Sequence, residues 1–277
     1  MPVHTPIRPF CLDELRIDRG KEHRPSRPRS PKKRAKAPVR EPIRPLGYAW
    51  YRPCKAALDF GLALVLLLVL GPVIMLTALL VRFTSRGPAF YTQTRVGRDG
   101  RLFTIFKIRT MIHNCESLTG PRWSIPGDPR ITPIGQFLRQ THLDELPQLL
   151  NVLRGDMSLI GPRPERPEFT AKLERALPAY PERLRVRPGV TGLAQVHLPG
   201  DTSLASVRIK LAHDLFYIQQ LSPGLEARIL FCTVLRVLGV SYESIRRLSG
   251  IPSEKIVERA VQLVMDGGPG RRWTKSA

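Results

Sequence analysis

The segment FGLALVLLLVLGPVIMLTALLV, residues 60–81, contains 22 consecutive residues without a charge. A helix needs about 20 apolar residues to cross a bilayer, and a core helix of a soluble protein rarely runs this long without a charged residue. The segment therefore predicts contact with a membrane. Gly71 and Pro72 at its centre predict a kink or a break, because proline removes one backbone hydrogen bond and clashes with the preceding turn.

Two topologies fit this segment. Each half has about 11 residues, roughly 16 Å of helix, which is too short to cross about 30 Å of hydrocarbon. A helix bent at its middle would dip into the membrane and return to the same face, whereas a kinked span would cross it. Basic residues on both flanks favour the re-entrant form, because both ends then stay in the cytoplasm. These residues are Arg52, Lys55, Arg82, Arg86, Arg95 and Arg98.

The charge of the whole chain is strongly positive, with 44 basic and 23 acidic residues and a net charge of +21. Such a charge favours anionic partners, which include nucleic acid, phospholipid headgroups and phosphorylated substrates. Residues 1–47 are rich in proline and basic side chains and predict a disordered tail, either simply solvated or held on anionic lipid. A membrane-tethered nucleic-acid-binding protein is the alternative function, but the basic residues alternate with proline rather than with aromatic residues, and no nucleic-acid-binding motif is present.

After the membrane segment, the pattern predicts a mainly helical α+β fold. Residues 89–111 place β-branched and aromatic residues on both sides of a Gly-Arg-Asp-Gly turn and predict a β-hairpin. Helices are predicted at residues 144–153, 164–178 and 203–220. One face of the last helix is apolar, which indicates either core packing or contact with the membrane interface. That face comprises Val207, Leu211, Leu215 and Ile218.

The residues that could carry chemistry gather around the adjacent carboxylates of Asp144 and Glu145. At a helix start such a pair often caps free backbone N–H groups. Rigidly framed cations nearby change this interpretation, because two acids with several cations suit metal-assisted phosphoryl transfer. Arg163 stands between two prolines that restrict the backbone, and its guanidinium matches phosphate oxygens. Arg139 lies upstream of the acids, and Lys107 lies at the end of the predicted hairpin.

Three stretches of this chain closely resemble the bacterial sugar transferase family, the monotopic polyprenyl-phosphate phosphoglycosyl transferases. They are SRGPAFYTQTRVGRDGRLFTIFKIRTM at 85–111, RITPIGQFLRQTHLDELPQLLNVLRGDMSLIGPRPE at 130–165 and RPGVTGLAQV at 187–196. The resemblance covers about residues 50–237. It implies a monotopic membrane enzyme with a re-entrant helix broken at Gly71 and Pro72, interfacial amphipathic helices, and a catalytic domain on the cytoplasmic face of the bacterial inner membrane.

The resemblance also implies a reaction. A sugar-1-phosphate moves from a UDP-sugar to undecaprenyl (polyprenyl) phosphate with release of UMP, the first membrane step of exopolysaccharide, O-antigen or glycan synthesis. Asp144 would be the nucleophile that forms a covalent phosphosugar-aspartyl intermediate. Glu145 would assist beside Mg²⁺, with both carboxylates near the metal, and Lys107, Arg139 and Arg163 would contact the substrate phosphates. The shared motifs do not indicate the sugar, the pathway or the oligomeric state.

These expectations divide the chain into four parts. They are a disordered tail at 1–47, a re-entrant membrane segment at 48–88, a catalytic domain at 89–237 and a C-terminal extension at 238–277 without an assigned role. The chain departs from the family pattern in three places. Gly-Pro replaces the usual Ser-Pro at the membrane helix break, His142 replaces the usual Ser or Thr, and residues 197–201 replace the usual Asn-Gly-Arg run.

Overall fold

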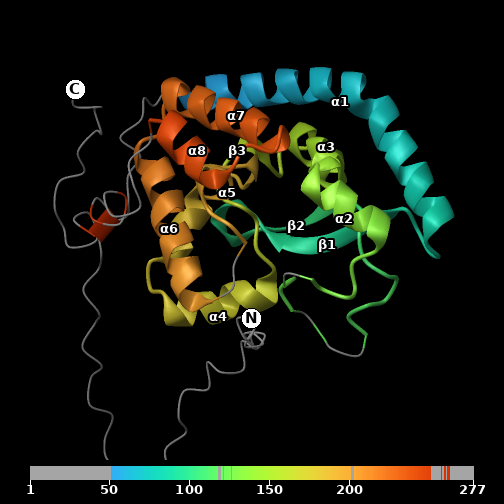
Figure 1. Ribbon diagram of the computed structural model, residues 1–277. Coiled ribbons are helices and arrows are strands. Elements are labelled where there is room, and N and C mark those ends of the chain that lie inside the picture. The colour runs from blue at the N-terminus through green and yellow to red at the C-terminus, as the bar shows by residue number, and fades with distance from the viewer. Residues whose placement is uncertain are drawn as a thin grey trace, which may run out of the picture.

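The computed structural model describes residues 51–117, 120, 122–125, 127–200, 203–250, 257, 259 and 261–262. The predicted tail at 1–47 and most of the C-terminal extension lie outside the described residues. Over the described part of the chain, helices predominate and the strands form two small sheets, as Figure 1 shows. The mainly helical α+β character is therefore confirmed.

Helix α1, Tyr51–Thr84, is one continuous helix of 34 residues that contains Pro72. Figure 1 shows it running along the top of the molecule, bending, and then descending at its far end. Gly71 and Pro72 predict either a kink or a break in this helix. The structure shows a bend, and the helix continues through it without interruption. Proline removes a single hydrogen bond of the helical ladder, so the turns on either side keep their helical pairing.

The inner face of α1 packs against the rest of the chain over most of its length. Ala63 and Val81, one on each side of Pro72, are fully buried, and Ile74 between them is 6% exposed. The helix contacts α3 (Leu149–Leu153), η3 (Leu143–Gln148), β2 (Leu102–Ile108) and β3 (Ser158–Ile160). Its outer face is a broad apolar surface, which in soluble monomers is rare and marks an interaction site. The exposed residues include Leu58, Phe60, Leu62, Leu64, Val65, Leu68, Val69, Met75, Leu76, Leu79, Leu80 and Phe83.

The predicted hairpin is confirmed. Strands β1, Phe90–Val96, and β2, Leu102–Ile108, are antiparallel, with Phe90 opposite Ile108 and Val96 opposite Leu102. The turn between them is the short helix η2, Arg98–Gly100, in which Asp99 has a left-handed φ of 55°. Aspartate is among the few non-glycine residues enriched in that conformation, which explains the Asp-Gly pair in the turn.

The second sheet brings together two segments that lie apart in the sequence. Strand β3, Ser158–Ile160, pairs in parallel with β4, Gly189–Thr191. Directly after β3 the backbones come so close that a Cβ on Gly161 would lie 2.4 Å from the carbonyl oxygen of Arg187. Only glycine fits there. The close contact fixes the exit of the chain from β3 toward Arg163.

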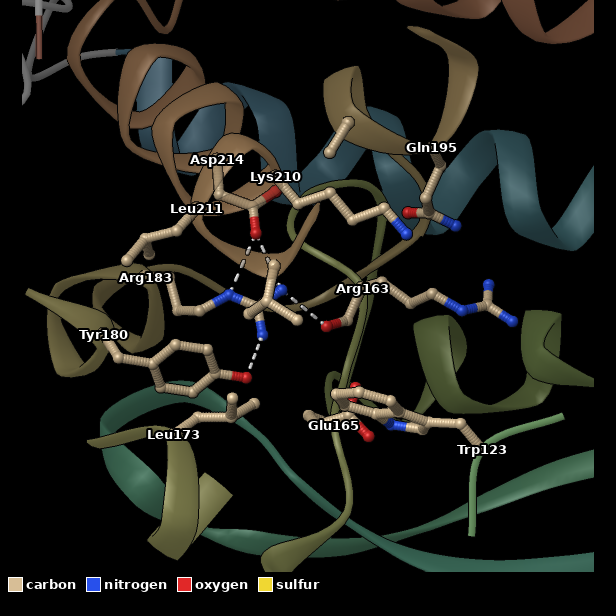
Figure 2. Close-up of a pocket in the computed structure, with 12 residues that line it drawn as sticks. Trp123, Arg163, Glu165, Leu173, Tyr180, Arg183, Gln195, Lys210, Leu211 and Asp214 are labelled. Atoms are coloured by element: carbon tan, nitrogen blue, oxygen red, sulfur yellow. Dashed lines mark hydrogen bonds and ion pairs between the residues drawn. The ribbon is translucent and has the colours of Figure 1, made fainter. Parts of the chain in front are cut away.

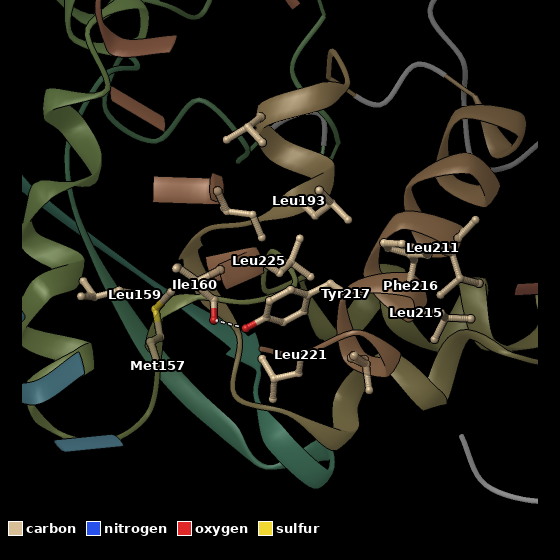
Figure 3. Packing of buried hydrophobic residues seen from close by; sticks show 14 of the residues in the cluster. Met157, Leu159, Ile160, Leu193, Leu211, Leu215, Phe216, Tyr217, Leu221 and Leu225 are labelled. Carbon is tan, nitrogen blue, oxygen red and sulfur yellow. Dashed lines mark hydrogen bonds between the residues drawn. The ribbon is translucent and has the colours of Figure 1, made fainter. Parts of the chain in front are cut away.

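The remaining helices complete the fold, and of these α3 and α7 pack against this sheet. They are α2 Pro133–Gln140, η3 Leu143–Gln148, α3 Leu149–Leu153, α4 Pro167–Ala176, η4 Tyr180–Arg185, α5 Leu193–His197, α6 Leu204–Gln219, α7 Pro223–Val237 and α8 Tyr242–Leu248. The predicted apolar face of α6 is buried in the main core, with Leu215 and Ile218 at most 1% exposed. Figure 3 shows Tyr217 of the same helix donating a hydrogen bond to the carbonyl of Ile160. Core packing is therefore confirmed for this helix, and the alternative, that its apolar face contacts the membrane interface, is wrong.

A buried polar network ties the start of α1 to β3 and α7. Glu226 of α7 accepts a hydrogen bond from the Tyr217 hydroxyl at 2.6 Å and pairs with the ammonium of Lys55 at 2.7 Å. Lys55 also pairs with Asp59 at 3.2 Å, and Asp59 accepts a hydrogen bond from the Ser158 hydroxyl at 2.6 Å. Buried charges are tolerated only when paired in this way. The network therefore holds α1 against the strand that leads to Arg163.

Candidate active site

Asp144 and Glu145 lie in the first turn of η3, where both side chains are buried. The preceding His142 has a left-handed φ of 58°, which turns the chain sharply from α2 into η3. The helix predicted at 144–153 is therefore present as η3 followed by α3, and Gly155, with a φ of 79°, follows its end. The tight turn brings both carboxylates beneath β2 and beside the segment after β3.

Glu145 is held by two cations from distant parts of the chain. Its Oε1 lies 2.7 Å from the Lys107 Nζ and 2.5 Å from the Arg163 Nη2, and its Oε2 accepts a second bond from Arg163 at 3.2 Å. Burial alone would raise the pKa of Glu145, but Arg163 and Lys107 outweigh it and hold the pKa well below its usual range. Glu145 is thus a fixed anion that orients both cations, not a helix cap.

Asp144 differs from its neighbour in having a free oxygen. Its Oδ1 is buried and has no hydrogen-bond partner among the described residues. Burial, and then the charge of Glu145, raise its pKa to about 6, although Lys107, Arg139 and Arg163 act in the opposite direction. The normal carboxyl pKa near 4 therefore does not apply to Asp144, which still ionises below pH 7. An ionised carboxylate with an unshared oxygen can attack phosphorus without a general base.

The basic residues predicted for the site divide into two groups. Lys107 and Arg163 contact Glu145 directly. Arg139 instead donates to the hydroxyls of Thr110 at 2.8 Å and Ser124 at 3.1 Å, and acts on Asp144 only through its charge. The structure therefore brings together four of the five predicted residues and holds the fifth beside them.

Arg109, two residues after Lys107, has a structural role. Its guanidinium donates to the Ser85 carbonyl at 2.9 Å and to the Ser85 hydroxyl at 2.8 Å, just beyond the end of α1. A cation there satisfies carbonyls that the helix leaves without partners. Gly71 and Pro72 lie within α1 and so outside the carboxylate cluster.

The side chains of this site offer few free oxygen atoms as ligands for a magnesium ion. Mg²⁺ is commonly held by one or two carboxylates, with phosphates and waters completing an octahedron. The unpartnered Oδ1 of Asp144 suits such a role, whereas both oxygens of Glu145 already pair with cations. Over the part of the chain that the structure describes, no three acidic, histidine or cysteine side chains gather in one place. Asp144 is therefore the principal candidate ligand, with Glu145 beside it.

A pocket next to Arg163 contains residues that the sequence did not single out as functional. It has a volume of about 50 Å³ and is lined by residues from several elements, shown in Figure 2. Its polar lining residues include Arg163, Glu165, Arg183, Gln195, Lys210 and Asp214. Gln195 lies in the TGLAQV stretch that carries the family resemblance, which was the one signal for it in the sequence.

His197, where the chain departs from the family's Asn-Gly-Arg run, is a core residue. It is 1% exposed and packs edge-on against His213 with ring centroids 6.0 Å apart. Burial, followed by the charge of His213, lowers its pKa to about 3, so the ring is neutral. This side chain faces the core and not the carboxylates.

Comparison with known proteins agrees with this geometry. The family model described as bacterial sugar transferase matches residues 50–240. A UDP-N-acetylgalactosamine-undecaprenyl-phosphate N-acetylgalactosaminephosphotransferase of Aeromonas hydrophila is 40% identical over 68% of this chain and 44% of its own length. A UDP-glucose:undecaprenyl-phosphate glucose-1-phosphate transferase of Caulobacter vibrioides is 42% identical over 66% of this chain and 69% of its own length.

A third relative, the exopolysaccharide production protein PSS of Rhizobium leguminosarum bv. phaseoli, is 41% identical over 66% of this chain and 94% of its own length. The chain thus spans less than half of the Aeromonas relative and most of the Rhizobium one. The family match covers both carboxylates, the cations around them and helix α1. The chain therefore belongs to the bacterial sugar transferase family.

Proposed function

We propose that this chain transfers a sugar-1-phosphate from a UDP-sugar to undecaprenyl phosphate and releases UMP. The observation that carries the proposal is the contrast between the two carboxylates. Asp144 keeps a free buried oxygen, while Glu145 is clamped between Lys107 and Arg163. The similar proteins named as undecaprenyl-phosphate sugar phosphotransferases support the substrate class.

The reaction proceeds in two displacements. An Asp144 carboxylate oxygen attacks the β-phosphorus of the UDP-sugar, and the bond from that phosphorus to the bridging oxygen breaks, so UMP leaves with the electron pair. A phosphate oxygen of the lipid then attacks the phosphorus of the aspartyl intermediate. The Asp144 carboxylate leaves, and a lipid diphosphate sugar is formed. Each step exchanges one oxygen for another on the same phosphorus, so no redox partner is needed.

The cations solve the main electrostatic problem of this reaction, the approach of a carboxylate to an anionic diphosphate. Lys107 and Arg163, held in place by Glu145, are preorganised to balance charge that develops on the phosphoryl oxygens. Arg139 lies near enough for its charge to affect Asp144. Mg²⁺, which Asp144 would hold as the principal ligand with Glu145 beside it, would supply further neutralisation of the diphosphate.

The proposed place of action is the cytoplasmic face of the bacterial inner membrane. The acceptor phosphate lies at the bilayer surface, and the exposed apolar face of α1 suits a domain seated there. Burial of Ala63 and Val81, one on each side of Pro72, favours a re-entrant helix, because a helix held against the domain over this length cannot project away across the bilayer. We therefore propose that α1 enters and leaves on one face.

Cysteine labelling tests this topology. Cys54 is exposed at the start of α1, and Arg86→Cys, in a chain whose other cysteines are serine, would mark the opposite flank. A membrane-impermeant maleimide added to intact cells should label neither position, and both should react after permeabilisation. Labelling of a single flank from outside the cell would show that α1 spans the membrane.

Release of UMP tests the reaction itself. Purified protein in detergent, with undecaprenyl phosphate and UDP-glucose or UDP-N-acetylgalactosamine, should release UMP when Mg²⁺ is present. Chelation with EDTA should reduce the rate to background, and added Mg²⁺ should restore it, because the diphosphate charge is then neutralised again. If a panel of UDP-sugars gives no UMP under these conditions, the proposed function is wrong.

A further inference from the structure

We infer that the pocket beside Arg163 binds the sugar of the UDP-sugar donor, and that Gln195 accepts a hydrogen bond from that sugar. The inference rests on the proposed function and adds a binding subsite to it. The pocket, of about 50 Å³, lies among η4, α5, α6 and the segment after β3, and Figure 2 shows its lining residues.

The position of the pocket follows from Arg163, which takes part in both sites. Its guanidinium holds Glu145, next to the nucleophile, and the same residue lines the pocket. The sugar of a UDP-sugar is attached to the attacked phosphorus through a single oxygen, whereas the uracil is separated from it by a second phosphate and a ribose. A pocket that lies one side chain away from the carboxylates therefore suits the sugar better than the base.

The chemistry of the walls matches a ligand with many hydroxyl groups. Trp123 offers an aromatic surface, and Figure 2 shows it on the side of the pocket opposite Gln195 and Lys210. Glu165 adds an acceptor, and Lys210 adds donors. A polyprenyl chain would place apolar groups against these polar and charged walls, which is unfavourable.

The floor of the pocket is a closed set of interactions. Arg183 donates to Asp214 at 2.9 Å and to the Tyr180 hydroxyl at 2.7 Å, and it also donates to the backbone carbonyl of Arg163 at 2.9 Å. These groups satisfy one another, so the floor is rigid and positions Arg163. The polar capacity left for a ligand lies in the walls.

Gln195 provides that capacity. Its Nε2 donates to the Val190 carbonyl at 3.0 Å, and its Oε1 is buried without a hydrogen-bond partner among the described residues. The bond to Val190 fixes which end of the amide is free, since reversing the amide would place two acceptors together. A buried acceptor without a partner is costly, and a hydroxyl or amide N–H of a sugar would satisfy it.

The test uses Gln195→Met, which keeps the length of the side chain and removes its acceptor. Calorimetric binding of UDP-sugar and UMP is measured on full-length protein that carries Asp144→Asn, so that the donor is not consumed, and kcat/KM for UMP release is measured on the same pocket variants with Asp144 intact. We expect Gln195→Met to bind the UDP-sugar about tenfold more weakly than the parent enzyme and to bind UMP equally well. Gln136→Met, at an exposed position of α2, is the matched control and should change neither.

UDP-sugar analogues that each lack one hydroxyl or the acetamido group identify the contacted group. The analogue that lacks the contacted group should lower kcat/KM of the parent enzyme about tenfold. It should not lower kcat/KM of Gln195→Met any further, because the same hydrogen bond is lost in both cases. Lys210→Met, from the facing helix α6, provides a second variant should Gln195→Met unfold. Thermal unfolding of each variant shows whether it is folded.

Three results would overturn the inference. UMP binding could weaken as much as UDP-sugar binding, which would place the nucleoside in the pocket. Every analogue could lower kcat/KM of Gln195→Met and of the parent enzyme by the same factor, which would exclude contact between Gln195 and the sugar. Both pocket variants could bind the donor as the parent does. If the parent binds donors but releases no UMP, the proposed reaction fails, while the binding measurements still decide the subsite.

Discussion

Asp144→Asn is expected to lower the rate of UMP release by roughly 10³-fold or more, because an amide cannot act as the attacking carboxylate. With UDP-sugar alone, the parent enzyme should gain the mass of a sugar phosphate on the peptide that carries Asp144, and the variant should not. Asp99→Asn is the matched control. Asp99 lies in the exposed hairpin turn with a φ of 55°, and asparagine tolerates this conformation equally well.

The same residue gives the reaction its pH dependence. Because burial and Glu145 raise the pKa of Asp144 to about 6, kcat/KM should fall about tenfold per pH unit below that value, as the nucleophile becomes protonated. A carboxyl with a raised folded-state pKa contributes stability below its unfolded pKa and loses it as the pH rises through about 6. The ionised Asp144 therefore destabilises the fold at pH 7, and Asp144→Asn should unfold at a higher temperature than the parent enzyme.

These outcomes separate chemistry from folding. A variant that is inactive but more stable cannot owe its inactivity to misfolding. Equal UMP release from Asp144→Asn and the parent enzyme would contradict the assignment of the nucleophile. A covalent sugar phosphate on a peptide without Asp144 would contradict it as well.

Arg163→Lys should lower kcat/KM roughly 10²-fold, and Arg163→Met roughly 10³-fold. Arg163 donates to both oxygens of Glu145, at 2.5 and 3.2 Å, and a lysine ammonium cannot reproduce this planar pair of bonds. Arg163 also lowers the pKa of Asp144, so the acid limb of the pH profile for Arg163→Met should move to higher pH.

The matched control for this change is Arg185→Lys. Arg185 pairs with Glu182 on the surface, and its side chain is 41% exposed. Exposed pairs of this kind contribute little to stability, so activity should be unchanged. If Arg163→Met retained the activity of Arg185→Lys, Arg163 would have no part in binding or balancing the phosphates.

Local sequence patterns were sufficient to predict several of the helices and strands of this protein. The alternation around the Asp-Gly turn predicted the hairpin of β1 and β2, and residues 203–220 predicted α6 nearly to its ends. The length of the uncharged segment predicted α1. These features depend on residues close in the sequence, so periodicity and turn chemistry are enough to find them.

The site was only partly predictable. The sequence pointed to both carboxylates and to the cations Lys107 and Arg163. The residue types alone, however, did not show how the two acids differ. The environments of the two acids differ because Lys107 and Arg163, 38 and 18 residues away, both converge on Glu145 and leave Asp144 with a free oxygen. Which carboxylate receives the cations depends on how β2 and the segment after β3 pack over η3.

The sequence by itself therefore determined the long apolar helix and the hairpin, because each depends on residues close together in the chain, and it predicted the residues of the proposed site. Tertiary structure decided that α6 is buried, that Arg109 supports the end of α1, and that Gln195 offers a free acceptor beside Arg163. Burial and charge pairing are properties of groups that meet only after folding. The environment of a side chain, and with it the pKa and the chemistry of Asp144, follows from that packing.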